Sequence, residues 1–93
     1  MILEIVSPEA KLFSGEVTAV TVPGVDGSFQ ILNNHAPIVS ILEKGTVKIA
    51  APSFNFSKEV VSKFTKVNDQ TYTLEITSGT IEMKDNKVIV LVD

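Results

Sequence analysis

His35 is the one histidine of the 93-residue chain, and it is the first residue to consider for chemistry. A catalytic histidine needs a carboxylate that orients it and a nucleophile or water beside it. The chain contains neither the G-x-S-x-G nor the H-x-x-E-H pattern that would bring such a set together. A zinc site needs at least three good ligands, and without cysteine only carboxylates remain to accompany His35. We therefore expect His35 to make one hydrogen bond or a surface contact. A small metal-binding or hydrolytic protein that uses His35 is the less favoured alternative.

The segment "PGVDGS", residues 23–28, is the second candidate for a binding site because it is rich in glycine. A phosphate-binding loop leads into the N-terminus of a helix, whereas Gly27 leads into the apolar run "SFQIL", which is typical of a strand. The segment therefore predicts a hairpin turn with glycine in a left-handed conformation. The acids in predicted turns lack the D-x-D-x-D-G spacing of a calcium loop; they are Asp26, Glu43, Asp69 and Asp85. We expect no cofactor.

Composition excludes several classes of function. The net charge is −3 and all eight cations are lysine, so the chain lacks the basic excess that neutralises a phosphate backbone. Nucleic acid is not an expected partner. No apolar run approaches the ~20 residues that a transmembrane helix needs, and the N-terminus lacks the pattern of a signal peptide. The absence of cysteine excludes disulfides.

Strand patterns dominate the elements that must position these residues. In "QTYTLEITSG", Tyr72, Leu74 and Ile76 share one face and threonines and Glu75 share the other. Short runs with the same character cover 2–7, 28–32 and 38–42, and turn residues separate them. The pattern predicts a mainly β fold, a sandwich or barrel of about 8–10 short strands, in one domain spanning 1–93.

Two segments near the ends of the pattern are ambiguous. "TIEMKDNKVIVLVD" predicts a hairpin with Asp85-Asn86 in the turn. Its second arm, 88–92, is apolar on both faces, so it is either central in a sheet or covered by something else. In "EVTAVTVPG" the apolar residues change from odd positions (Val17 and Ala19) to even positions (Val20 and Val22). A bulge near Ala19 or a second buried face would explain this shift.

The segment "NFSKEVVSKFTKVND" breaks the strand pattern. Val60, Phe64 and Val67 fall at i, i+4 and i+7, and Ser57 suits an N-cap. We therefore predict a short amphipathic helix at 58–67. The alternative is a strand, since valine, phenylalanine and threonine also favour strands.

Several runs together carry a resemblance to a known family. They are "KLFSG" at 11–15, "VTVPGVDG" leading to "ILNNHAPI", and the later runs "LEKGTVKI", "ITSGTIEM" and "NKVIVLVD". The chain resembles the N-terminal domain of the epsilon subunit of F-type ATP synthases, which is called delta in mitochondria. The resemblance covers nearly the whole chain apart from residues 52–70, and the H-A-P block is its most specific part.

The resemblance implies a flattened β-sandwich at the foot of the central stalk. There it implies a non-catalytic rotor subunit that packs on the gamma subunit, touches the polar loops of the membrane c-ring, and helps couple proton transport to ATP synthesis. The expected location is the cytoplasmic face of the bacterial membrane, with the membrane contacted only indirectly through the complex. A generic β-sandwich adaptor is the alternative.

The resemblance also suggests contact residues. The ring-facing loops of the family match 25–28 and 33–36, and the strand that follows lies near gamma. The candidates for contacts with the c-ring or gamma are Val25, Asp26, Gly27, Ser28, Asn33, Asn34, His35, Ala36, Ile38, Ser40 and Leu42. Of the residues on the strand 38–42, Ile38, Ser40 and Leu42 are candidates on whichever face of the strand points outward.

The chain departs from the family pattern at several positions. Asn33-Asn34 replaces the usual Pro-Gly, and Asn34 can still adopt a left-handed conformation, at some cost relative to glycine. Gln30 replaces a common glycine, and Ser28 stands where an acidic residue is frequent. Typical bacterial members continue into a two-helix hairpin that can brake ATP hydrolysis and, in some, bind ATP. If Asp93 is the natural C-terminus, we expect neither function.

Overall fold

The computed structural model describes all residues, 1–93, as ten β-strands and one short 3₁₀ helix, η1 (Val61–Lys63). The strands are β1 (Ile2–Val6), β2 (Lys11–Glu16), β3 (Ala19–Gly24), β4 (Gly27–Leu32), β5 (Ile38–Leu42), β6 (Gly45–Ala50), β7 (Phe64–Asn68), β8 (Thr71–Ile76), β9 (Gly79–Lys84) and β10 (Lys87–Val92). The mainly β fold that the sequence predicts is confirmed, at the upper end of the expected strand number. The structure contains no helix with the length and apolar character that a membrane crossing requires.

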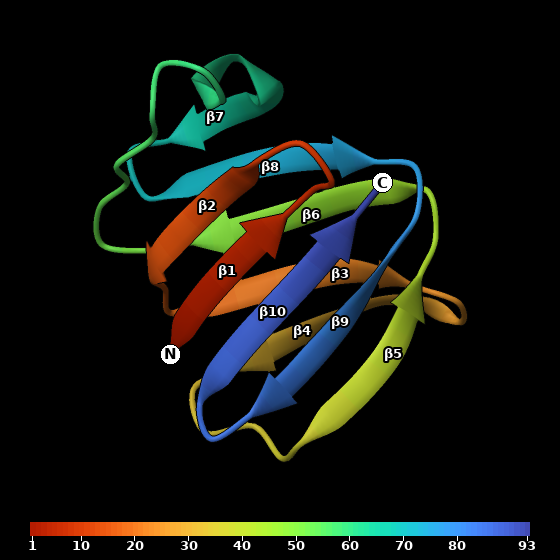
Figure 1. Ribbon diagram of the computed structural model, residues 1–93. Helices are drawn as coiled ribbons and strands as arrows, with labels where there is room; N and C mark the ends of the chain where they lie inside the picture. The colour runs from red at the N-terminus through yellow and green to blue at the C-terminus, as the bar shows by residue number, and fades with distance from the viewer.

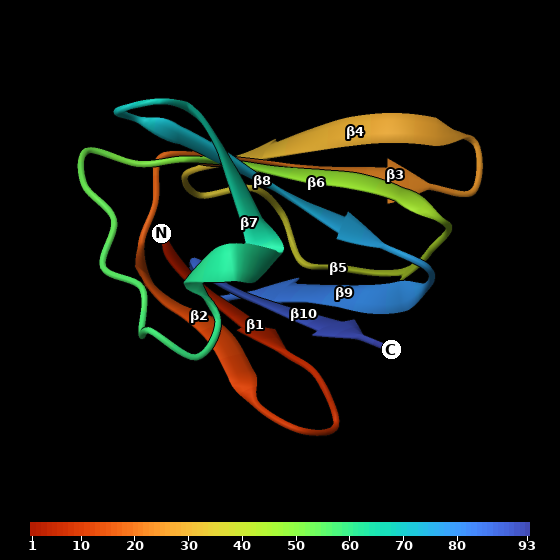
Figure 2. The same cartoon turned by 90° about the horizontal axis from the view of Figure 1, so that it is seen from above.

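One hydrogen-bonded path joins nine of the strands in the order β2-β1-β10-β9-β5-β3-β6-β8-β7. The path curls into two facing layers, with β2, β1, β10, β9 and β5 in one and β3, β6, β8 and β7 in the other (Figure 2). The layers are joined where Gly24 of β3 pairs with Leu42 of β5. β4 lies off this path and pairs with β3 only. The predicted sandwich is therefore confirmed.

The first and last strands are neighbours. β1 runs parallel to β10, with Leu3 opposite Val88 and Ile5 opposite Val90 (Figure 1). β10 is antiparallel to β9 on its other side, through a hairpin whose turn residues Asp85 and Asn86 have φ values of 53° and 59°. The hairpin predicted at Asp85-Asn86 is confirmed. The apolar run at 88–92 is a central strand, which was one of its two interpretations.

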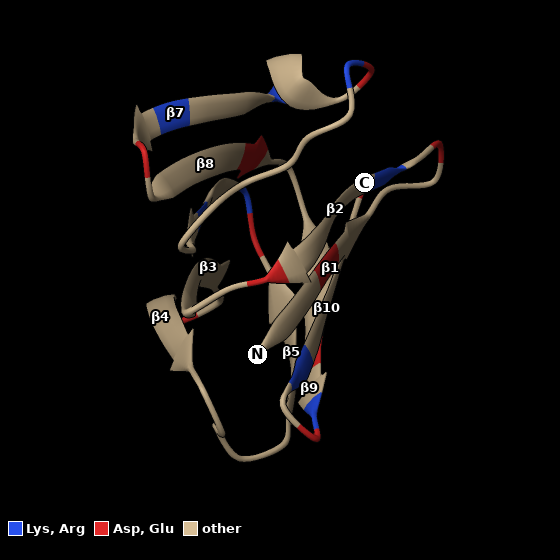
Figure 3. Ribbon diagram, turned by 90° about the vertical axis from the view of Figure 1, so that its left-hand side faces the viewer, with Lys and Arg blue, Asp and Glu red and all other residues tan.

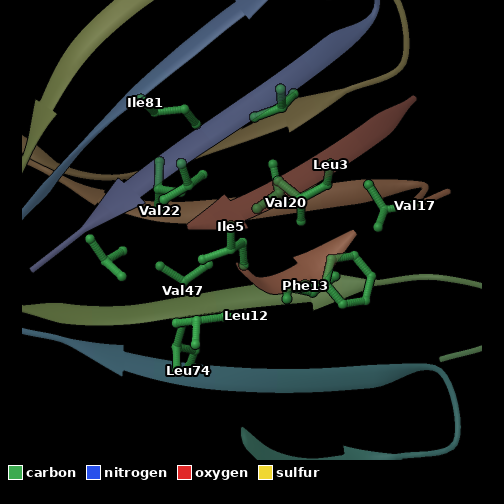
Figure 4. Close-up of a cluster of buried hydrophobic side chains, with 14 of the residues drawn as sticks. Leu3, Ile5, Leu12, Phe13, Val17, Val20, Val22, Val47, Leu74 and Ile81 are labelled. Carbon is green, nitrogen blue, oxygen red and sulfur yellow. The ribbon is translucent and has the colours of Figure 1, made fainter. Parts of the chain in front are cut away.

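Alternate residues of the strands fill the space between the layers with apolar side chains. The core is a single cluster of 22 buried residues, and no polar or charged residue is buried. Leu3 and Ile5 from one layer meet Val20, Val22 and Val47 from the other (Figure 4). The interior is therefore held together by the burial of apolar side chains.

The parity shift in "EVTAVTVPG" has a simpler cause than a bulge. Val17 is buried, but it lies in the bend between the end of β2 and the start of β3 at Ala19. The backbone N–H of Val17 donates to the Met1 carbonyl oxygen at 2.8 Å. Val17 is therefore buried from the bend, whereas Val20 and Val22 are buried from β3. β3 pairs in an unbroken register from Ala19 onward.

The helix predicted at 58–67 is wrong. Only Val61–Lys63 forms a 3₁₀ turn, and Phe64–Asn68 forms β7, as the strand alternative proposed for that part. Val60 and Phe64 are buried, but Val67 is 57% exposed, so the three residues do not share a buried face. Phe64 is instead held by pairing with Leu74 of β8 and by contacts with other aromatic rings.

Five of the six aromatic residues of the chain form an aromatic cluster at one end of the sandwich: Phe13, Phe54, Phe56, Phe64 and Tyr72. The ring of Phe56 lies at its centre, with centroids 4.4 Å from Phe64, 4.8 Å from Tyr72 and 5.7 Å from Phe13. Such edge-tilted pairs add to the area that the rings bury. The long segment between β6 and β7 is therefore fastened to both layers by its own phenylalanines.

Candidate contact surface

The first predicted contact loop is the turn of the β3–β4 hairpin. Val25 and Asp26 form the turn, Gly24 pairs with Gly27, and Gly27 has a φ of 116°, a conformation that favours glycine. The turn is followed by strand β4 rather than a helix, so the expected hairpin with a left-handed glycine is confirmed. Val25 is 58% exposed and Asp26 is also exposed, so the tip is available to a partner.

The second predicted contact loop, 33–36, is hydrogen-bonded to two distant parts of the chain. The Met1 amino group donates to Asn33 Oδ1 at 2.7 Å, and the Asn34 N–H donates to Asn86 Oδ1 at 2.8 Å. Asn34 has a φ of 62°, so it adopts the left-handed conformation. Asn33 and Asn34, the two residues that depart from the family pattern, thus take part in the hydrogen bonds that hold this loop in position.

His35 is exposed, and its ring nitrogen Nδ1 lies 2.7 Å from the carbonyl oxygen of the adjacent Ala36. Its own backbone N–H donates to the Leu32 carbonyl oxygen at 3.2 Å. Neither neighbour is a carboxylate or a hydroxyl, so the geometry provides no acid–base chain. Nowhere in the chain do histidine and carboxylate side chains gather in a group that could hold a metal ion.

β4 separates the two contact loops instead of bringing them together. The turn at 25–26 precedes β4 and the loop at 33–36 follows it, so six residues of extended chain lie between them. At about 3.3 Å per residue, these six residues place the loops roughly 20 Å apart. The predicted ring-facing residues therefore form two sites joined by one strand, not a single patch.

The residues that β5 exposes to solvent are not the ones predicted as contact candidates. Leu42 is only 1% exposed and belongs to the core, so it is not a surface residue, which corrects its inclusion among the contact candidates. Ile38 and Ser40 are half-buried on the same side of the strand. Val39 and Ile41 point the other way and are 77% and 65% exposed. Because residues alternate along a strand, burying Leu42 turns Val39 and Ile41 to solvent.

Val39 and Ile41 belong to a larger outer apolar face on the layer β1-β10-β9-β5. Two rows of paired residues cross it: Ile41, Thr80, Leu91 and Val6 form one, and Val39, Glu82, Ile89 and Glu4 form the other. Leu91 is 50% exposed and Ile2, at the end of the layer, is 41% exposed. An apolar surface of this extent, with polar residues among it, is typical of a protein contact.

A compact ion network covers the β1 end of the outer apolar face. Glu4 accepts a 3.3 Å hydrogen bond from Lys11 Nζ, and Lys87 Nζ lies 3.4 Å from its other carboxylate oxygen. The Lys11 hydrogen bond and the positive charge of Lys87 hold the pKa of Glu4 below its usual value. The charge of Glu4 is thus balanced by two lysines of the same chain. The exposed apolar side chains beside it remain available to a partner.

A surface hollow lined by residues of both layers belongs to none of these features. Its apolar lining comes from both layers, through Leu12, Leu74, Ile76 and Val92. Glu9, Glu75, Asp93 and Lys63 surround it with charges of both signs. It shares no residue with the two loops or the outer apolar face, and no polar side chain is buried in it to orient a cofactor.

Residues 1–63 match the family model described as ATP synthase, Delta/Epsilon chain, beta-sandwich domain. The chain belongs to this family. The ATP synthase epsilon chain of Chlorobium limicola is 36% identical over 91 residues, which cover 98% of this chain and 86% of that protein. The epsilon chain of Pelotomaculum thermopropionicum is 34% identical over 89 residues, but these cover only 54% of its length. The epsilon-family chain thus spans most of one relative and about half of the other.

Two solved structures share the fold of this epsilon-family chain. One is a chain of the Tetrahymena thermophila mitochondrial ATP synthase central stalk and c-ring, with a TM-score of 0.70 at 20% identity. The other is a chain of the Euglena gracilis mitochondrial ATP synthase, with a TM-score of 0.77 at 17% identity. The matches cover 99% of this chain, and 62% and 49% of those chains. At these identities the likeness establishes the fold.

Sequence reasoning missed the exposed residues of the outer apolar face of this epsilon-family chain. The doubly apolar run at 88–92 was the available signal, because it required either a central position or a cover. The structure gives it a central position and still leaves Leu91 half-exposed. The central interpretation is therefore the one that the structure confirms.

Proposed function

We propose that this chain is a central-stalk rotor subunit of a proton-translocating ATP synthase. In this role it binds the gamma subunit and the polar loops of the c-ring, and it helps couple proton transport to ATP synthesis without catalysing a reaction itself. It acts as one β-sandwich domain at the cytoplasmic face of the bacterial membrane, reached only through the complex. Membership of the delta/epsilon family and the relatives named ATP synthase epsilon chain support this proposal.

The observation that carries the proposal is the outer apolar face. The core already contains 22 buried apolar residues, yet Val39, Ile41 and Leu91 remain at least half exposed on one layer. We assign the gamma contact to this face, because burying these side chains against a partner removes apolar area from water at about 25 cal/mol per Å². Ile38 and Ser40 lie at the rim of this contact, on the half-buried side of β5.

We assign the ring contact to the two exposed loops. The turn tip presents Val25 and Asp26, with Gly27 and Ser28 behind them, and the second loop presents His35 and Ala36. The c-ring loops are polar in this family, and both contact loops offer polar groups. Asn33 and Asn34 hold the second loop in place through the hydrogen bonds to Met1 and Asn86.

The gamma assignment is tested by mixing the chain with the gamma subunit of the same organism. Gel filtration should give one co-eluting complex, and Ile41→Lys should weaken it at least about tenfold, since a desolvated charge at an interface core costs several kcal/mol. Val67→Lys is the matched control, because Val67 is similarly exposed but lies on β7 of the other layer. Separate elution of the wild-type chain and gamma would refute the proposed function.

The ring assignment is tested with membranes that hold the assembled c-ring and gamma. His35→Ala should reduce rebinding of the chain to these membranes while its melting temperature stays unchanged, because the ring of His35 is exposed and bonds only to a neighbouring carbonyl. A loss of folding in His35→Ala would show instead that His35 is a structural residue.

A further inference from the structure

The free edge of β4 is unusual among the edges of this sandwich. β4 pairs with β3 along its whole length and with no other strand. Exposed edges are normally protected by charged side chains, proline or bulges, which discourage pairing with another chain. The sequence of β4, "GSFQIL", has none of these, and its pairing with β3 shows no register shift. In Figure 3, β4 carries neither basic nor acidic colour, whereas β7 carries lysine.

The alternation of hydrogen bonds identifies which groups of β4 are free. Pro23 of β3 lies opposite Ser28, has no N–H, and its carbonyl oxygen accepts from the Glu43 N–H at 2.8 Å on the side away from β4. Pro23 and Ser28 are therefore a non-hydrogen-bonded pair, so the next such pairs are Thr21–Gln30 and Ala19–Leu32. In such pairs the backbone groups point away from the partner strand.

Ser28, Gln30 and Leu32 thus direct their backbone groups to the open edge. Only the Leu32 carbonyl oxygen is occupied there, by the N–H of His35 at 3.2 Å. The three N–H groups and the carbonyls of Ser28 and Gln30 have no partner within the chain. Donors and acceptors that repeat at every second residue match one kind of ligand, the main chain of another extended strand.

The surroundings of this edge indicate which strand it takes. A hollow lined by Ser28 and Phe29 of β4 also includes Ser40 of β5, so the edge lies beside the half-buried side of β5. Ser40 belongs to the rim of the contact assigned to gamma, so the edge adjoins that contact at its rim. Phe29 is only half-buried beside this hollow, and an apolar residue on an added strand would cover it. Asp26 is the one charged group in residues 17–42, and it would pair with a basic residue at the end of that strand.

We propose that an extended segment of the gamma subunit adds to β4 as an eleventh strand, bonded to Ser28, Gln30 and Leu32. This inference rests on the proposed function, and it states a mode of recognition that the outer apolar face alone does not require. The added segment runs between the two contact loops. It has apolar residues at alternate positions and a basic residue near Asp26.

Hydrogen–deuterium exchange followed by NMR tests the proposal on the wild-type chain with and without gamma. In the free chain the amides of Ser28, Gln30 and Leu32 should exchange fast, while those of Phe29 and Ile31, which bond to β3, should exchange slowly. In the complex the first three should slow at least about tenfold, because a hydrogen-bonded amide exchanges only after opening. Phe29 and Ile31 serve as internal controls. Protection at Val39 and Ile41 alone would mean that the strand adds to β5, which overturns the proposal.

A pair of variants provides the second test. Gln30→Pro removes an edge N–H without breaking a bond to β3, and Gln30→Ala changes the side chain but keeps the edge. Gln30→Pro should bind gamma at least about tenfold more weakly than Gln30→Ala. The proline removes the N–H that would bond to the added strand, and its ring blocks the approach of that strand, so both effects weaken binding. Equal binding of the two variants overturns strand addition while leaving the proposed function intact. If the wild-type chain and gamma fail to associate, both strand addition and the proposed function are refuted.

Self-association is the remaining outcome. If the chain alone forms a dimer in sedimentation experiments, and Gln30→Pro disperses it, the occupant of the edge is a second copy and the gamma assignment is wrong. A monomeric wild-type chain with unprotected amides at 28, 30 and 32 agrees with the proposal.

Discussion

The backbone N–H of Asn34 donates a 2.8 Å hydrogen bond to Oδ1 of Asn86, 52 residues further along the chain. Asn86 occupies a left-handed position in the β9–β10 turn, with a φ of 59°, while Asn34 lies in the loop that follows β4. Asn86 therefore takes part in the hairpin turn through its backbone and anchors the β4–β5 loop through its side chain. The position of the second contact loop depends on a turn that has no part in the proposed contact.

Replacing Asn86 separates its two roles. Asn86→Gly keeps a residue that favours positive φ but removes the amide acceptor, so we expect a loss of about 0.5–1.5 kcal/mol in the free energy of unfolding. Asn86→Ala should lose roughly 1 kcal/mol more, because alanine is strained in the left-handed region. Urea unfolding measures both, and exchange of the Asn34 amide should quicken in each variant. An Asn34 amide that stays protected in Asn86→Gly would contradict the anchor.

Asn34 itself should respond in the opposite direction. Its backbone makes the hydrogen bond to Asn86, and its φ of 62° is one that glycine adopts without strain. Asn34→Gly should therefore raise the free energy of unfolding by about 0.5 kcal/mol, and Asn34→Ala should lower it by about 1 kcal/mol. Chemical denaturation at constant pH compares the pair. A stabilising Asn34→Ala would show that the loop does not need the left-handed conformation.

The aromatic cluster predicts where the long β6–β7 connection gains its stability. Phe56 lies within 6 Å of Phe13, Phe64 and Tyr72, measured between ring centroids. Phe56→Ala should lower the free energy of unfolding by about 2 kcal/mol, less than for a fully buried phenylalanine because Phe56 is half-buried. Val67→Ala, on the exposed side of β7, should change it by less than about 0.5 kcal/mol. Limited proteolysis should cut residues 52–60 faster only in Phe56→Ala, and equal rates would count against the cluster.

The network around Glu4 predicts a specific pH dependence. The pKa of Glu4 is lowered in the folded state, by the Lys11 hydrogen bond first and then by the charge of Lys87. A carboxyl whose pKa is lowered on folding stabilises the fold above its unfolded pKa, and this contribution disappears as the pH falls through the folded pKa. Stability should therefore decrease on acidification below about pH 4.5, the ordinary value for this group.

Glu4→Gln isolates this contribution. The variant should show a shallower loss of stability on the acid side than the wild-type chain and the same slope near neutral pH, measured from urea midpoints. Since the network is at the surface, added salt should reduce the difference between the two proteins. Glu82→Gln is the control on the same face, because no ion pair holds Glu82 in the structure. Identical acid slopes for wild type and Glu4→Gln would rule the network out as a source of stability.

Local patterns in the sequence predicted the elements whose signals are themselves local. Asp85-Asn86 between two alternating runs gave the β9–β10 hairpin, and Gly27 after Val25-Asp26 gave the β3–β4 turn, because turn residues report their own backbone conformation. The strands at Gly27–Leu32 and Ile38–Leu42 also match the expected runs to within one residue. Each of these features depends on residues within a few positions of one another.

Features that depend on distant partners could not be predicted. The spacing of Val60, Phe64 and Val67 suits a helix, but Phe64 pairs with Leu74 and packs on rings from Phe13 and Phe56, which overrides the local pattern. On β5, four of five residues are apolar, so only the pairing with β9 decides that Leu42 is inside and Ile41 outside. The Asn34–Asn86 hydrogen bond has no local signal at all.

The parallel pairing of β1 with β10 has a consequence for synthesis on the ribosome. Leu3 and Ile5 are synthesised about 85 residues before Val88 and Val90, which flank them in the finished sheet. At about 5–20 residues per second, the first strand waits several seconds or more with its apolar side chains uncovered. The layer that holds β1 cannot be completed before β10 (Lys87–Val92) has left the ribosomal tunnel.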